Sequence, residues 1–159
     1  MFREGACGLV WLSLALTFTC AVADAQVSEE SPVVSELRER LTNFFGNLRD
    51  HRTQEAYAVL LVDSQLAKPE RQNQREQLVK KTAELESVYG RARGYELIQA
   101  RKVGADLVLF KYLYKCEEYP VVWYIAFYRD ARSVETGSAY GNWKVISVRF
   151  DTDLESLLK

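Results

Sequence analysis

The chain has 159 residues, and its 21 basic and 22 acidic side chains give it a formal net charge of only −1. A chain so close to neutral has no general electrostatic attraction to nucleic acid or to an anionic membrane surface. The charge balance therefore argues against a nucleic-acid-binding protein.

The first 25 residues have the three parts of a secretory signal peptide. Arg3 supplies a positive start, an apolar stretch follows over residues 9–22, and residues 23–25 read Ala-Asp-Ala. The apolar stretch is shorter than the roughly 20 residues that a membrane-spanning helix needs. We predict cleavage after Ala25, export to the periplasm or the medium, and no stable membrane insertion after cleavage. An uncleaved anchor and a lipoprotein attached through Cys20 are the weaker alternatives, the latter because Phe18 is bulky for a lipoprotein signal.

The predicted mature chain has 134 residues, enough for one domain with a single hydrophobic core. Loss of Arg3, Glu4 and Asp24 leaves 20 basic and 20 acidic residues. We expect residues 26–30 to form a flexible leader and residues 31–159 to form the domain. Cys116 is then the one cysteine left, so an internal disulfide is excluded. We expect a passive thiol there, with redox exchange or an intermolecular disulfide as alternatives.

Three helices are predicted in the first half of the mature chain. Ser31 and Pro32 have the form of an N-cap followed by proline at the first helical position, and the apolar spacing continues to about Arg49 or Asp50. The second helix begins near Thr53, which we expect to cap it, and ends near residue 64. The third begins at Lys68-Pro69, and the glycine at position 90 stops it.

From residue 95 the pattern changes from helical to alternating, which predicts strands over 95–103, 107–116, 121–129 and 142–151. Residues 130–141 form a predicted loop, and residues 153–158 a short tail. Because no helix interleaves with the strands, the order indicates an α+β fold with an antiparallel sheet.

Neither face of the predicted sheet is cleanly polar. In the third strand Trp123, Ile125 and Phe127 alternate with a second apolar and aromatic set that includes Tyr124 and Tyr128. One face must cover the helices. We expect the other to meet a second subunit, a curled wall of the sheet or a ligand.

Three segments carry a resemblance to a known family. They are Gly94-Tyr95-Glu96-Leu97-Ile98, the strand from Val121 to Arg129, and Gly141-Asn142-Trp143-Lys144-Val145. With the helical first half, they make the chain similar to small exported bacterial proteins of the nuclear-transport-factor-2-like superfamily, which includes SnoaL-like and ketosteroid-isomerase-like groups. The resemblance implies three N-terminal helices packed in a strongly curved antiparallel sheet of four or more strands, a cone-like, cystatin-like roll. It also implies a cavity at the wide end and a homodimer formed through the sheet.

The aromatic residues are the best candidates for a ligand pocket, because their rings combine an apolar body with a polar tip. The set is Tyr57, Tyr112, Tyr114, Trp123, Tyr124, Tyr128 and Trp143, and all of these except Tyr124 are predicted pocket residues. Such a pocket suits a small apolar or aromatic ligand. The alternatives for any one ring are that it fills the core of a curved sheet or lies in a dimer face.

No catalytic residue, metal site or cofactor is predicted. The isomerases that this chain resembles combine a tyrosine with acidic residues, whereas Asp106, Asp130 and Asp151 fall at predicted strand ends or turns, where aspartate is expected for local backbone reasons. His51 is the only histidine, and we expect it to be exposed near a helix boundary. One histidine and one cysteine are too few for a zinc site.

The sequence thus favours an exported, non-enzymatic binding or interaction module that uses an aromatic-lined cavity or a sheet face. A small-molecule isomerase or dehydratase and a structural accessory subunit of an envelope complex are the alternatives.

Overall fold

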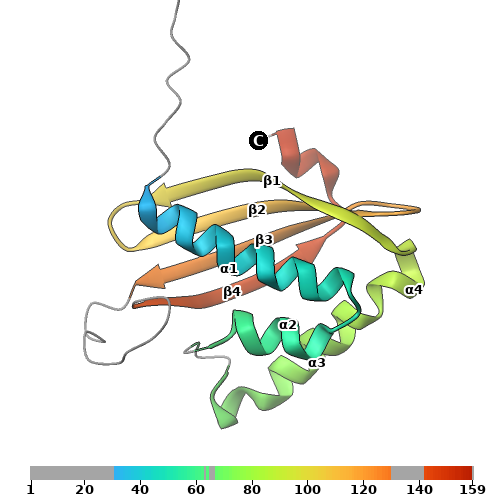
Figure 1. The fold of residues 1–159 in the computed structure, drawn as a ribbon, viewed down its shortest axis with the longest axis horizontal. Coiled ribbons are helices and arrows are strands. Elements are labelled where there is room, and N and C mark those ends of the chain that lie inside the picture. The colour runs from blue at the N-terminus through green and yellow to red at the C-terminus, as the bar shows by residue number, and fades with distance from the viewer. Residues whose placement is uncertain (1–30, 63, 65–66, 130–141, 159) are drawn as a thin grey trace, which may run out of the picture.

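The computed structural model describes residues 31–62, 64, 67–129 and 142–158, and these residues form an α+β fold with a four-stranded antiparallel sheet. Helix α1 lies across one face of the sheet, and α2 and α3 lie on the β4 side of α1 (Figure 1). The predicted signal peptide 1–25, the leader 26–30 and the predicted loop 130–141 lie outside the described residues. No helix within the described ranges is long and apolar enough to cross a membrane.

Helix α1 spans Pro32–Arg49 and α2 spans Thr53–Leu60. The predicted starts are therefore confirmed, as is Ser31 as the N-cap residue of α1 with proline in its first turn, but the predicted cap of α2 is wrong because Arg52 is its N-cap residue. Neither Ser31 nor Thr53 caps with its hydroxyl: the Ser31 carbonyl accepts from the amide of residue 34 at 2.7 Å, and Thr53 already lies inside the first turn. Helix α2 also ends four residues earlier than predicted.

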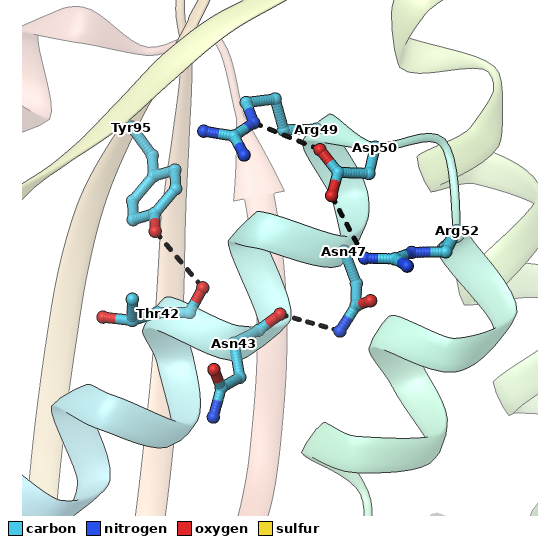
Figure 2. Close-up of polar contacts among 7 residues, drawn as sticks. All are labelled: Thr42, Asn43, Asn47, Arg49, Asp50, Arg52 and Tyr95. Carbon is cyan, nitrogen blue, oxygen red and sulfur yellow. Dashed lines mark hydrogen bonds and ion pairs between the residues drawn. The ribbon is translucent and has the colours of Figure 1, made fainter.

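Polar contacts fix the C-terminal half of α1 (Figure 2). The Tyr95 hydroxyl, from the first strand, donates to the carbonyl of Thr42 at 3.2 Å. At the end of the helix Asp50 contacts Arg49 at 3.3 Å and Arg52 at 3.1 Å. These contacts fix the end of α1 against the sheet and against the start of α2.

The third predicted helix is divided into a 3-10 turn η2 (Pro69–Arg71), α3 (Gln72–Ala83) and the short α4 (Leu85–Tyr89). Gly90 ends it, as predicted, with a φ of 80° that favours glycine. A β-carbon at this position would lie 2.9 Å from the Cβ of Glu117. Glycine is required here for both the turn and the close approach.

The sheet is a meander in the order β1-β2-β3-β4, with β1 (Ala92–Val103), β2 (Leu107–Cys116), β3 (Val121–Arg129) and β4 (Trp143–Asp151). The predicted second and third strands are confirmed at both ends. The sheet is open, with β1 and β4 as its edges. Bulges interrupt the register at Ile98 in β1 and at Ile146 in β4, and bulges bend and twist a sheet locally.

A buried arginine joins α1 to α2 and β4. Arg40 is only 1% exposed, and its guanidinium donates to the carbonyls of Leu60 at 2.6 Å, Val62 at 2.8 Å and Trp143 at 3.4 Å. The carbonyls at the end of a helix have no partner within the helix, so Arg40 satisfies the end of α2. The sequence pattern did not predict this role.

Candidate functional site

Five of the six predicted pocket residues lie in the core between the helices and the sheet. Tyr57, Tyr112, Tyr114, Trp123 and Trp143 are all at most 5% exposed. Two rings of α1 pack among them: Phe44 lies 5.6 Å from Trp123, and Phe45 lies 4.7 Å from Tyr112 between ring centroids. These rings pack in the core, which was the alternative left open for each of them, although Tyr114 also borders a small hollow on the helix side and Tyr57 borders a separate hollow of about 580 Å³ beside α2.

The sixth predicted pocket residue is on the other side of the sheet. Tyr128 is 47% exposed and pairs in register with Leu107, on the face that points away from the helices. We call this side the outward face. The structure therefore does not bring the six residues together in one site.

The strand register places two cross-strand rows of side chains next to each other on the outward face. The rows are Gln99, Lys111, Tyr124 and Arg149 in the first, and Arg101, Leu109, Ala126 and Ser147 in the second. Together they line a hollow of about 330 Å³, which we call the outward groove. This volume lies within the range of about 300–1,000 Å³ of small-molecule sites.

Two cationic side chains converge on one ring in the outward groove. The guanidinium carbon of Arg149 lies 4.5 Å from the centroid of the Tyr124 ring, and the Lys111 ammonium lies 5.8 Å from it. Cations are attracted to the face of an aromatic ring, which explains why both side chains lie there. Arg101 adds a third positive charge at the β1 side. Among the described residues that line the groove, none is acidic.

The C-terminal 3-10 turn η3 (Leu154–Leu158) holds two of these side chains. Lys111 donates to the carbonyl of Ser156 at 2.7 Å, and the Tyr124 hydroxyl is hydrogen-bonded to the hydroxyl of Ser156. Because Lys111 and Tyr124 belong to the outward face, η3 lies on the side of the sheet opposite α1. It therefore contacts two residues of the groove lining from the same face, without lining the groove itself.

A second, smaller hollow of about 150 Å³ lies between the helices and the β2 end of the sheet. His51, Glu86, Tyr114 and Cys116 all line it. The Nδ1 atom of His51 lies 2.8 Å from the Glu86 carboxylate, and 63% of the histidine side chain is exposed. We call it the helix-side pocket. It contains the one histidine, which the sequence placed correctly at a helix boundary but without a partner.

His51 occupies the position after the α1 C-cap that glycine most often fills. Its φ is 60°, its amide donates to the carbonyl of Leu48 at 3.0 Å, and the next amide, of Arg52, donates to Asn47 at 2.8 Å. This is the Schellman pattern of helix termination. The left-handed conformation directs the chain from α1 into α2 and brings the imidazole to Glu86.

Two groups of the helix-side pocket stay protonated at neutral pH. Burial is the main cause that raises the pKa of the Tyr114 phenol well above its ordinary value of 10.0, and the charges of Cys116 and Glu86 add to it. Burial and the Glu86 carboxylate also raise the pKa of the Cys116 thiol. Both side chains are therefore hydrogen-bond donors rather than nucleophiles.

Sequence reasoning missed Lys111, Tyr124 and Arg149 as members of one site. Alternation along the third strand gave the right face for Tyr124, but the sequence does not show which residues pair across strands. No group of three or more His, Cys, Asp and Glu side chains within the described ranges is placed to hold a metal ion.

Comparison of the chain with protein-family models, with curated proteins and with solved structures gives no match in any of the three.

Proposed function

We propose that the chain is an exported, non-enzymatic binding module whose working surface is the outward groove. The convergence of Lys111 and Arg149 on the ring of Tyr124 carries this proposal. The ring attracts each cation, but the two like charges repel each other, and a bound group of opposite charge would offset this repulsion. The groove also has an apolar floor at Leu109 and Ala126, so it combines the apolar and polar contacts of a ligand site.

The test is to fill the groove. Ala126→Trp places a large ring in the floor, whereas Tyr128→Trp changes a residue two positions along the same face that is already exposed. Melting temperatures would be measured with a panel of anionic, cationic and neutral amphiphiles. We expect at least one class to raise the melting temperature of the unchanged protein and of Tyr128→Trp but not of Ala126→Trp. No rise with any class, or an equal rise in both variants, would contradict the proposal.

Export is part of the same proposal, supported by the three-part pattern of residues 1–25. Intact-mass measurement of the protein from the periplasm or the medium tests it. The expected mass is that of a chain beginning at Gln26, and a full-length chain retained in the cytoplasm would contradict it.

We also propose that the domain is a nuclear-transport-factor-2-like, cone-like roll. The support is the order of helices before an antiparallel meander, and the bulges at Ile98 and Ile146, which bend strands. An experimental structure in which the sheet does not curve around the helices would contradict this assignment.

A homodimer through the sheet competes with a ligand for the outward face. The exposed apolar side chains on this face support it, among them Leu109 and Tyr128. Light scattering after size exclusion is the test: a concentration-dependent dimer lost in Ala126→Trp identifies a second copy as the occupant. An accessory role in an envelope complex requires the same face to be covered in that complex.

The second candidate function is a small-molecule isomerase or dehydratase that uses the helix-side pocket. The observation in its favour is the His51–Glu86 pair beside the protonated Tyr114 phenol, a base and a donor in one hollow. Turnover of a carbonyl substrate that is lost in both His51→Gln and Tyr114→Phe would establish it. Retention of full activity in either variant would exclude the pocket as the site.

A further inference from the structure

The outward groove contains more positive charge than its own side chains neutralise. Two of its cations lie over one ring, and Arg101 extends from the β1 side. Among the described residues, the next cross-strand row holds two carboxylates, both outside the groove lining: Asp151, which is 3.9 Å from the Nε atom of Arg149, and Glu96, which is paired with Lys115. An anion bound beside these cations would offset their excess positive charge.

One of these donors, the Lys111 ammonium, is also held in place before any ligand arrives. The Lys111 ammonium has three N–H donors. One of them donates a hydrogen bond to the Ser156 carbonyl, so two remain for a ligand. The Asp151 contact involves Nε of Arg149, and a guanidinium presents several donors in one plane. A planar fork of this kind matches the two oxygens of a carboxylate.

Beside these cations the floor of the groove is apolar and has small side chains. Leu109 is 38% exposed, and Ala126 and Ser147 leave the space that larger residues would fill. Ile98 and Ile146, the extra residues of the two bulges, are exposed next to Gln99 and Ser147 in the chain. An apolar body can therefore lie along the second row while a charged head stays at the first.

We propose that the outward groove binds a small amphipathic carboxylate, with its head at the Lys111 and Arg149 side chains that flank Tyr124 and its apolar body over Leu109 and Ala126. This inference rests on the proposed function and names the chemistry of the ligand.

The test is an amide NMR titration of the purified protein with four probes that separate head from body. Octanoate has both parts, octanol has the body alone, octyltrimethylammonium has the opposite charge, and acetate has the head alone. We expect saturable shifts of groove amides on β2, β3 and β4 with octanoate. Binding should be at least tenfold weaker with octanol and acetate, and undetectable with the ammonium compound.

Charge variants make the test specific to the groove. Lys111→Gln with Arg149→Gln should weaken octanoate binding at least tenfold and leave octanol binding unchanged. The matched control is Lys115→Gln, on the same strand and face as Lys111, whose ammonium is paired with Glu96 outside the groove lining. This control should leave the octanoate affinity unchanged.

The remaining outcomes separate the two proposals. If octanol or the ammonium compound binds in the groove as tightly as octanoate, the carboxylate proposal is overturned and the proposed function stands. Amide shifts in the groove that depend on protein concentration in the absence of a probe also overturn the carboxylate proposal and leave the proposed function standing. They identify a second copy of the chain as the occupant. Shifts located only in the helix-side pocket, or none with any probe, overturn both.

Discussion

The two faces of the sheet use aromatic residues in opposite ways. Trp123 and Tyr124 are neighbours in the chain, yet Trp123 is fully buried against Phe44 and Phe45 while Tyr124 lies under Lys111 and Arg149. On the helix-covered face the rings pack against each other and stabilise the core. On the outward face a ring supports charged groups beside an open hollow. An aromatic residue in a strand therefore does not by itself indicate a ligand site, because what matters is which face it occupies and what covers that face.

The largest expected difference between the faces is in stability. Trp123→Ala should lower the free energy of unfolding by about 4 kcal/mol, because it leaves a cavity among the packed rings. Tyr128→Ala, on the outward face, should lower it by less than about 1 kcal/mol. Urea unfolding of both variants measures the comparison. Similar losses would show that the outward face is also a packed core.

Arg40 tests whether the helix-covered side depends on a polar contact as well as on its rings. Arg40→Met should lower the free energy of unfolding by about 3 kcal/mol, because the buried carbonyl of Leu60 and the partly buried carbonyl of Val62 lose their donor. Arg38→Met changes an exposed residue of the same helix and should have an effect of less than about 0.5 kcal/mol. Equal unfolding midpoints in urea would contradict this role of Arg40.

Alkaline pH should weaken the helix-covered side. Burial raises the pKa of the Tyr57 and Tyr114 phenols above the ordinary value of 10.0. Above that pH the unfolded chain releases these protons while the folded chain keeps them, so the unfolded state is favoured. Each phenol should then contribute a loss of about 1.4 kcal/mol per pH unit. Below pH 10 this contribution to stability is fully present.

The measurement is the urea midpoint between pH 8 and pH 11. The control is the double variant Tyr57→Phe with Tyr114→Phe, which should show a shallower fall above pH 10. An unchanged fall in the double variant would assign the pH dependence to other groups.

Much of the fold followed from the sequence, whereas the site did not. Helix starts at Pro32 and Thr53, the stop at Gly90 and the limits of β2 and β3 are set by local signals such as proline, glycine and alternation. Alternation along the third strand also predicted that Trp123 and Tyr124 lie on opposite faces of the sheet. The outward groove depends instead on the pairing of residues far apart in the chain, and on two bulges that shift this pairing, neither of which has a local signature. The burial of Arg40 depends in the same way on carbonyls of other elements.

The smallest expected effect concerns η3, which contacts Lys111 and Tyr124 of the outward groove. Ser156→Ala removes the hydroxyl that bonds to Tyr124 but keeps the backbone carbonyl that accepts from Lys111. The loss in the free energy of unfolding should be about 0.5 kcal/mol, because a partly exposed hydrogen bond is largely replaced by water. If η3 positions the ring for binding, octanoate affinity should fall severalfold in the same variant. Ser35→Ala, at an exposed position of α1, should change neither quantity. A loss of stability without a loss of affinity would show that η3 only covers the sheet, and that the strands alone position the side chains of the groove.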